Sequence, residues 1–169
     1  MDVMEKNETI KLDETDLSIL REIRQDSRIS NNELARRINL SQPAAHNRLK
    51  RLKTTGVIRD YTVLLDYEKL GYELICFFQT RLQGHLEKDI TLFESRVAAF
   101  PEVLECHYLT GEFDHLIKAV FKHRRDLEQF LRNKLSTIPG VAQIITSLVL
   151  SEIKSDNAFL LPDDNLRKI

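Results

Sequence analysis

The segment from Ile29 to Arg59 constrains the fold of this chain more than any other part of the sequence. Its centre, LSQPAAHNRLKRL, is typical of a tight turn followed by a short basic helix. From Leu34 to Arg59 there is no Asp or Glu, although the whole chain has a net charge of -1. Because the positive charge is concentrated in one place, we expect a polyanion as its partner. The basic residues are Arg36, Arg37, Arg48, Lys50, Arg51, Lys53 and Arg59.

Capping signals divide this segment into two helices. Ser30 to Glu33 fits the S-x-x-E capping box at the start of the first one. Ser41 is the N-cap of the next helix, because Pro43 falls in its first turn, where no amide hydrogen is needed. Gly56 ends it. Ala35, Ala44 and Ala45 allow close packing, so the pair predicts a helix-turn-helix at about residues 31–50. An earlier helix capped by Asp13 presents an apolar stripe to this motif.

The geometry of a helix-turn-helix assigns roles to the residues of its second helix. The N-terminal part of a recognition helix faces base edges in the major groove. Gln and Asn pair with adenine, and Ala or Pro contacts the thymine methyl group. The predicted readers of base sequence are Ser41, Gln42, Pro43, Ala44, His46 and Asn47.

The basic side chains of the motif have a different predicted role. Arg36, Arg48, Arg51 and Lys53 are placed to reach phosphates of double-stranded DNA. For Arg48, an ion pair with an acid of the first helix is the alternative. We expect Arg51→Ala to weaken binding to all sequences and to lower the salt slope by about one. The competing interpretation is a solvated basic face on a helical bundle, but the caps, turn and alanines together favour DNA binding.

From residue 74 onward the sequence has a different periodicity. Strands are predicted at 74–82, 103–110, 115–121 and 141–153, and helices at 87–100 and 126–136. This β-α-β-β-α-β order is that of a ferredoxin-like domain. Strand alternation leaves Ile75 and Phe77 on the sheet face opposite the helices, so we expect a sheet-to-sheet homodimer.

The predicted fold class is α+β, with an N-terminal winged helix-turn-helix domain followed by a ferredoxin-like βαββαβ domain. The β-rich residues 57–65 predict a short wing or linker strand. The predicted parts are a flexible N-terminus (1–10), the DNA-binding domain (11–65), a linker (66–73), the second domain (74–154) and a C-terminal tail (155–169).

Composition and spacing exclude several other classes. No apolar run approaches the roughly 20 residues of a membrane span, and the polar N-terminus is unlike a signal peptide, so we expect a cytoplasmic protein. Cys76 and Cys106 form no CxxC and are expected to be buried thiols in a reducing compartment. We find no nucleophile–base pair, phosphate-binding loop or zinc spacing, and therefore expect no enzyme and no cofactor.

A metal site is the remaining chemical alternative. Cys106, His107 and His115 fall on neighbouring predicted strands. Adjacent side chains of a strand point to opposite faces, however, and two or three ligands alone do not make a site. No metal is expected.

Both halves together resemble the Lrp/AsnC family of transcription regulators, the leucine-responsive or feast/famine class. The similarity spans residues 12–154. It implies a DNA-binding domain, a RAM-type domain that responds to an amino-acid effector, and dimers that assemble further, commonly into octamers. The matching stretches are LDETDLSIL (12–20), SRISNNELARRINLS (27–41), RLKRLKTTGVIRDYT (48–62), PEVLECHYLTGEFDHLIKA (101–119) and IPGV (138–141).

The resemblance also implies an effector site between dimers, at the turn before the third strand and near the last strand. Asp114 beside the glycine turn offers an acceptor for an ammonium group; its alternative role is to cap the turn. Leucine responders of the family carry an aromatic residue where Ser147 sits and an apolar one where Arg124 sits, which favours a more polar ligand here. The implied effector residues are Thr110, Gly111, Glu112, Phe113, Asp114, Arg124, Thr146, Ser147 and Leu148.

We therefore expect a sequence-specific DNA-binding regulator whose DNA binding or assembly responds to an amino acid. A DNA-packaging protein of the same fold with low sequence specificity is the alternative. The two differ in the ratio of specific to non-specific affinity, and no motif encodes that ratio.

Overall fold

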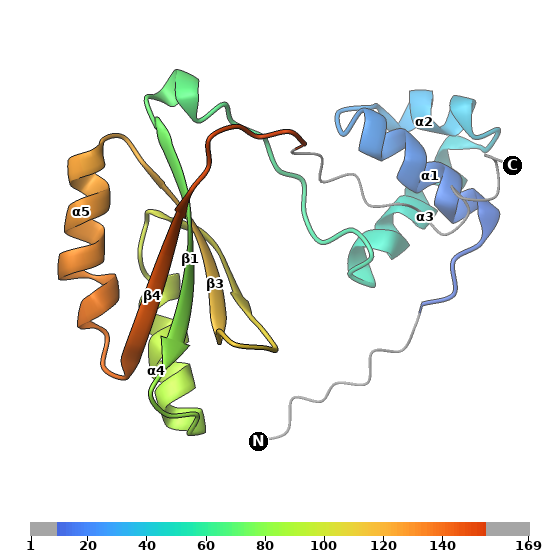
Figure 1. The fold of residues 1–169 in the computed structure, drawn as a ribbon. Helices are drawn as coiled ribbons and strands as arrows, with labels where there is room; N and C mark the ends of the chain where they lie inside the picture. The colour runs from blue at the N-terminus through green and yellow to red at the C-terminus, as the bar shows by residue number, and fades with distance from the viewer. Residues whose placement is uncertain (1–9, 155–169) are drawn as a thin grey trace, which may run out of the picture. The chain divides into compact units, whose positions relative to one another are not determined.

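The computed structural model describes residues 10–154. The predicted C-terminal tail (155–169) and, apart from Ile10, the predicted flexible N-terminus lie outside the described residues. The described chain forms two compact units that divide between Leu64 and Leu65 (Figure 1). We call them the helical unit and the sheet unit and describe each by itself.

The helical unit consists of α1 (Glu14–Gln25), α2 (Asn31–Arg37) and α3 (Gln42–Thr54). Asp13 begins α1 with a reciprocal capping box, in which its side chain and that of Asp16 each accept a backbone amide of the other residue. The Ser30 hydroxyl caps α2 as predicted, by accepting from the Glu33 amide. The core is small and apolar, and its buried members are Ile19, Ile23, Leu34 and Leu52.

A short turn sets the second helix of the motif against the first. Asn39 has a φ of 54°, in the left-handed region that Asn tolerates better than most residues. The Leu40 amide then donates to the Ala35 carbonyl at 2.9 Å. Pro43 lies in the first turn of α3, and Gly56, with a φ of 75°, follows its end. These features confirm the predicted helix-turn-helix.

The prediction of a strand in residues 57–65 is wrong. This stretch is irregular in the structure. Val63 and Leu64 are 77% and 72% exposed. β-branched composition favours a strand only where a neighbouring strand pairs with it, and residues 10–64 contain no such partner.

The sheet unit is a four-stranded antiparallel sheet with both of its α-helices on one face (Figure 1). Its strand order is β2-β3-β1-β4, which confirms the ferredoxin-like prediction. Single 3-10 turns lie at Glu68–Leu70 and Leu135–Thr137. The elements are β1 (Leu74–Leu82), α4 (Glu87–Ala98), β2 (Val103–Tyr108), β3 (His115–Phe121), α5 (Arg124–Asn133) and β4 (Val141–Leu148).

Aromatic side chains fill the space between the sheet and its helices. Phe78, Phe93, Phe121 and Phe130 are among the largest fully buried side chains of the chain. On β1, Cys76 and Phe78 are buried on this side, while the alternate residues Ile75 and Phe77 are only partly buried on the other. The described chain therefore leaves one face of the sheet without a covering layer, as the alternation predicts.

Several details of the sheet unit differ from the sequence prediction; β2 ends at Tyr108 instead of residue 110, and α4 ends at Ala98 instead of residue 100. β4 ends at Leu148 instead of residue 153, because Leu148 pairs with Cys76 near the first residue of β1. Cys106 is exposed, since it lies on the edge strand β2, whereas Cys76 is buried. α5 begins two residues earlier than predicted, because His123 is its N-cap and Asp126 completes a capping box.

Residues 10–154 lack two features, a membrane-spanning helix and a metal-binding cluster. Within that range no helix combines the length and apolar character that a membrane crossing requires. The same residues include no cluster of three or more His, Cys, Asp or Glu side chains suited to a metal ion.

Candidate nucleic-acid interface and effector region

The residues of α3 divide between a buried face and an exposed one. Ala45 and Leu52 are fully buried against the helical core. Ser41 is exposed and acts as the N-cap, since its hydroxyl accepts from the Ala44 amide. Ala44 is half-buried, and the remaining predicted readers lie exposed together on the first turns of α3; these are Gln42, Pro43, His46 and Asn47.

One of these predicted readers, His46, is held by α2. The His46 Nδ1 and the Asn31 side-chain amide are 3.2 Å apart and hydrogen-bonded. Both residues line a hollow of about 310 Å³ together with Leu49, Lys50 and Lys53. Sequence reasoning did not assign Asn31 or Lys50 to the site. Helical spacing would have found Lys50, because residues four and three apart, such as 46, 50 and 53, share one side of a helix.

Two arginines predicted to reach phosphates turn toward α1 instead. The Arg48 Nη1 donates to Asp13 Oδ2 at 2.6 Å and to Asp16 Oδ1 at 3.0 Å. Arg51 Nη2 donates to Asp16 Oδ2. The hydrogen bonds that Arg48 donates to Asp13 and Asp16 raise the pKa of Arg48 above its ordinary value. The hydrogen bond from Arg48, followed by that from the Asp16 amide, lowers the pKa of Asp13. Arg48 thus makes the internal ion pair that was its alternative role.

Other basic residues of the motif are paired on the surface. Arg36 donates to Glu33 at 2.7 Å, and Arg37 bridges Glu33 and Glu22 at 2.8 and 2.9 Å. Hydrogen bonds from Arg36 and Arg37 lower the pKa of Glu33 to about 2. Lys53 stacks its ammonium over the Tyr61 ring, 4.6 Å from the centroid.

The turn between β2 and β3 is fixed by Asp114. Its Oδ2 accepts from the Leu82 amide at 2.7 Å, and its Oδ1 hydrogen-bonds with His85 Nε2 at 2.9 Å. Its own amide donates to the Thr80 carbonyl at 2.9 Å. Burial alone would raise the pKa of Asp114, but the Leu82 amide and His85 lower it below the usual value. Both carboxylate oxygens thus tie the turn to the end of β1 and to His85.

The rest of the turn is more open. Thr110, Gly111 and Glu112 are exposed and Phe113 is half-buried. Gly111 has a φ of 129°, which an L side chain rarely adopts. The backbone of this turn is therefore accessible between two firmly bonded ends.

A single chain does not bring all of the predicted effector residues together. The turn precedes His115 at one end of β3, whereas Arg124 follows Phe121 at the other. The seven residues of β3 span roughly 20 Å. Thr146, Ser147 and Leu148 are exposed on the edge strand β4, where Leu148 pairs with Cys76 toward the Arg124 end. Within one chain the turn and Arg124 therefore lie at opposite ends of β3, and residues 146–148 lie on a different strand from both.

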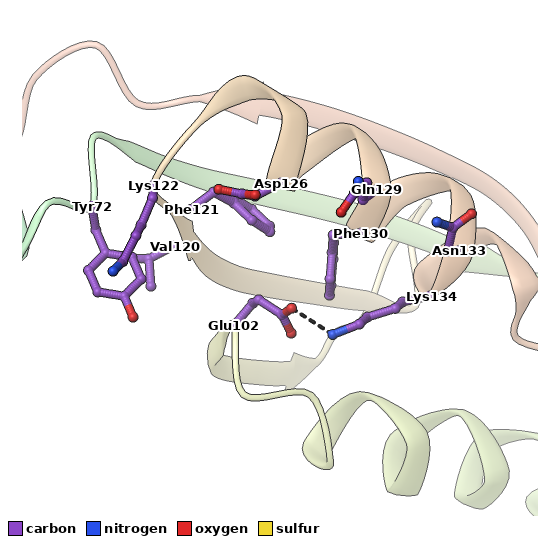
Figure 2. Close-up of a pocket in the computed structure, with 10 residues that line it drawn as sticks. All are labelled: Tyr72, Glu102, Val120, Phe121, Lys122, Asp126, Gln129, Phe130, Asn133 and Lys134. Carbon is purple, nitrogen blue, oxygen red and sulfur yellow. Dashed lines mark hydrogen bonds and ion pairs between the residues drawn. The ribbon is translucent and has the colours of Figure 1, made fainter.

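A further hollow of about 430 Å³ lies beside α5 in the sheet unit (Figure 2). At one end Lys134 donates to Glu102 at 2.6 Å, and at the other Lys122 lies 5.4 Å from the centroid of the Tyr72 ring. The sequence analysis did not predict this hollow, because it depends on the contact between residues 102 and 134. Its lining is completed by Val120, Phe121, Asp126, Gln129, Phe130 and Asn133.

A helix-turn-helix unit joined to a ferredoxin-like sheet unit defines the class of two-domain DNA-binding regulators. The sequence matches the family model for the Lrp/AsnC ligand binding domain over residues 75–159 and that for winged helix-turn-helix DNA-binding over residues 12–59. The chain belongs to the Lrp/AsnC family of transcriptional regulators. It is thus a DNA-binding transcriptional regulator with a ligand-binding domain.

Known members of the family are similar over nearly their whole length. The leucine-responsive regulatory protein of Rhizobium meliloti is 34% identical over 145 residues, covering 86% of this chain and 93% of the relative. A transcriptional regulator of Neisseria meningitidis, solved in complex with L-Met, has a TM-score of 0.84 at 34% identity, covering 92% and 99% of the two chains. The E. coli AsnC structure has a TM-score of 0.82 at 26% identity, covering 88% and 99%.

Proposed function

We propose that this chain reads specific DNA sites with α3 and that a free amino acid controls its DNA binding or assembly. The observation that carries the DNA part is the exposed row on the first turns of α3, where Gln42, His46 and Asn47 present hydrogen-bonding groups beside Pro43. Gln and Asn amides discriminate adenine in the major groove. The proposed domains are residues 11–65 for DNA and 74–154 for effector and assembly, joined by residues 66–73. The proposed site of action is the cytoplasm, where the DNA partner is.

One recognition helix contacts too few base pairs for selectivity, so a second copy is part of the proposal. The open sheet face supplies a surface for it. Ile75 and Phe77 are partly buried there, and Ile145, opposite Gln79 in the register, is 39% exposed. A second copy packed on this face would remove these apolar side chains from water. We propose a sheet-to-sheet homodimer, and further assembly toward an octamer.

The amino-acid effector is supported by the relatives and by the geometry of the turn. One relative is named for its response to leucine, and one neighbour was solved with L-Met. The turn has backbone amides near Gly111 for a carboxylate, and the exposed Glu112 side chain for an ammonium. Asp114 serves this site by fixing the turn to β1. The distance of Arg124 and residues 146–148 from the turn within one chain fits a site that is completed between copies.

Two measurements test this function. Binding to the protein's own promoter is compared with binding to random DNA at physiological salt, and we expect a ratio of about 10³ or more. A ratio near one favours the packaging protein. Each free amino acid is then tested for thermal stabilisation, where a ligand at 100 times its Kd adds about 2.7 kcal/mol. If none of them raises the Tm, the sheet unit acts in assembly alone.

A further inference from the structure

The cap of α1 and two arginines of α3 form one closed set of hydrogen bonds, which we call the α1–α3 charge cluster. Its members are Asp13, Asp16, Arg48 and Arg51. The Asp13 amide donates to Asp16 Oδ2 at 3.2 Å, and the Asp16 amide donates to Asp13 Oδ1 at 2.8 Å. Arg48 then binds both carboxylates, and Arg51 binds that of Asp16. The same carboxylates therefore begin α1 and hold α3.

Asp16 is the centre of this cluster because its side chain is 0% exposed. A buried carboxylate is tolerated only when charged or hydrogen-bonding partners replace the lost water. Here each oxygen of Asp16 has an arginine of α3 as its partner. Rotation or sliding of α3 would break these bonds and leave the carboxylate unpaired. The cluster thus fixes the rotation of α3 about its own axis.

The charges of the cluster balance, since two carboxylates face two guanidinium groups. Binding to phosphates releases counterions in proportion to the positive charge that meets them. A guanidinium already neutralised by a carboxylate contributes little to that count. Arg48 and Arg51 are therefore poor candidates for the groups that set the salt dependence of DNA binding.

The opposite side of α3 carries basic side chains that have no carboxylate partner within residues 10–154. Lys50 and Lys53 lie one turn apart beside His46, at the hollow between α2 and α3. Neither lysine forms an ion pair with a residue of the described chain, although Lys53 stacks on Tyr61. Of the seven basic residues of the motif, Arg36, Arg37, Arg48 and Arg51 have carboxylate partners, whereas Lys50, Lys53 and Arg59 form no ion pair within the described chain.

We propose that Asp16 is a positioning residue for DNA reading, and that Lys50 and Lys53, not Arg48 and Arg51, supply the charge that meets the phosphates. The proposal rests on the proposed insertion of α3 into the groove. It replaces the sequence-based prediction for Arg51→Ala, because loss of Arg51 now acts through the position of α3. Its effect would then fall on affinity and specificity and leave the salt slope unchanged.

The test compares four variants of the full chain, Asp16→Asn, Arg51→Gln, Lys50→Gln and Lys53→Gln. Affinity for the protein's own promoter and for random DNA is measured across a salt series, well below the Tm of each variant. Each lysine variant is expected to lower the slope of log K against log salt by about 0.9, with an unchanged Tm. Asp16→Asn and Arg51→Gln are expected to keep the slope and to lose tenfold or more of the specific-to-random ratio.

Two controls separate positioning from a general loss of stability. Ile19→Val removes a methylene from a fully buried side chain of α1 without touching the cluster, and should lower the Tm while keeping the specificity ratio. The double variant Asp16→Asn/Arg51→Gln should lose no more specificity than either single variant, because both changes break the same contact.

Several results would overturn the proposal. A drop of about one unit in the slope of Arg51→Gln with no change in its Tm would place Arg51 on a phosphate. Equal loss of specificity in Ile19→Val and Asp16→Asn would reduce Asp16 to a stabilising residue. If the wild-type protein binds DNA without sequence preference, the proposed reading function fails, and the slopes of the lysine and arginine variants still decide the charge assignment. Failure of the wild-type protein to bind any DNA overturns both.

Discussion

The core cluster of the helical unit contains four buried apolar side chains, whereas that of the sheet unit contains eleven. The helical unit adds ion pairs between its helices, with Asp16 at their centre. The larger core of the sheet unit is packed by ring contacts, such as Phe121 with Phe130 at 5.2 Å between centroids, although this unit also has ion pairs such as Lys134 with Glu102. Buried charge therefore adds to a small core in the helical unit, whereas apolar volume dominates in the sheet unit.

The exposed surfaces of the two units also differ in chemical character, one being polar and cationic and the other apolar. α3 exposes polar and cationic side chains, which fit a polyanion. The open face of the sheet exposes Ile145 and partly buries Phe77, which fits another apolar surface. We expect a change of charge to disturb the helical unit and a change of volume or apolar character to disturb the sheet unit.

The largest effect is expected from Phe130→Ala. Phe130 is 1% exposed and contacts the rings of Phe78, Phe100 and Phe121. Its truncation should lower the free energy of unfolding of the sheet unit by about 3–5 kcal/mol. Denaturant unfolding measures this loss. Leu150→Ala, at a side chain that is 93% exposed, should stay within about 0.5 kcal/mol of the wild type. A similar loss of unfolding free energy for both variants would contradict the idea that buried apolar volume stabilises the sheet unit.

The next effect is expected from Asp16→Asn in the helical unit. The amide cannot accept from both arginines as the carboxylate does, so a buried polar contact is lost. We expect the free energy of unfolding to fall by about 2 kcal/mol. Circular dichroism during denaturation measures this loss. Glu14→Gln, in the same turn of α1, is the matched change and should cost less than about 0.5 kcal/mol. Equal costs would show that the charge cluster does not fix this unit.

A smaller change is expected from Phe77→Glu on the open sheet face. A second copy would remove water from a carboxylate at this position. We therefore expect the dimer Kd to rise at least tenfold, which corresponds to about 1.4 kcal/mol of association free energy. Sedimentation equilibrium measures the dimer Kd. Leu92→Glu on α4, where Leu92 is 38% exposed on the helical side, should leave the Kd unchanged. If the Leu92 variant dissociates and the Phe77 variant does not, the interface lies elsewhere.

The smallest effect is expected from Glu33→Gln and concerns the free energy of unfolding at acidic pH. The hydrogen bonds from Arg36 and Arg37 lower the pKa of Glu33 from 4.5 to about 2. The folded pKa lies below the unfolded one, so this contribution is present above pH 4.5 and is lost as the pH falls through about 2. Glu33→Gln should therefore make the free energy of unfolding of the helical unit depend less on pH in this range. Glu87→Gln, in the first turn of α4, is the control in the sheet unit, and an identical curve for both variants would contradict the assignment.

Local signals explain most of what the sequence predicted. β1 and β3 have the predicted bounds, because each is an apolar run whose ends are marked by turn residues. The end of β4 was missed because it depends on the register with β1. The strand predicted at residues 57–65 is absent for the same kind of reason, since a strand needs a partner that local composition does not specify.

The candidate site also contains features that local sequence predicts and features that depend on contacts between distant residues. Helical position was enough to predict that Gln42 and Asn47 lie exposed on the first turns of α3. The partners of Arg48 and Arg51 lie 32 to 35 residues away, so no local pattern reveals that these side chains turn inward. The engagement of Asp114 with Leu82 and His85 is likewise a contact between distant residues.

The position of Asp13 and Asp16 has a consequence for how the helical unit forms. α3 has 13 residues, and an isolated helix of about 12–15 residues is marginal in water. The cap of α1 and the anchor of α3 share the same two carboxylates, so neither helix reaches its final stability before the other has docked. We therefore expect this unit to fold in one cooperative step, with no populated intermediate in which α3 is already in place without α1.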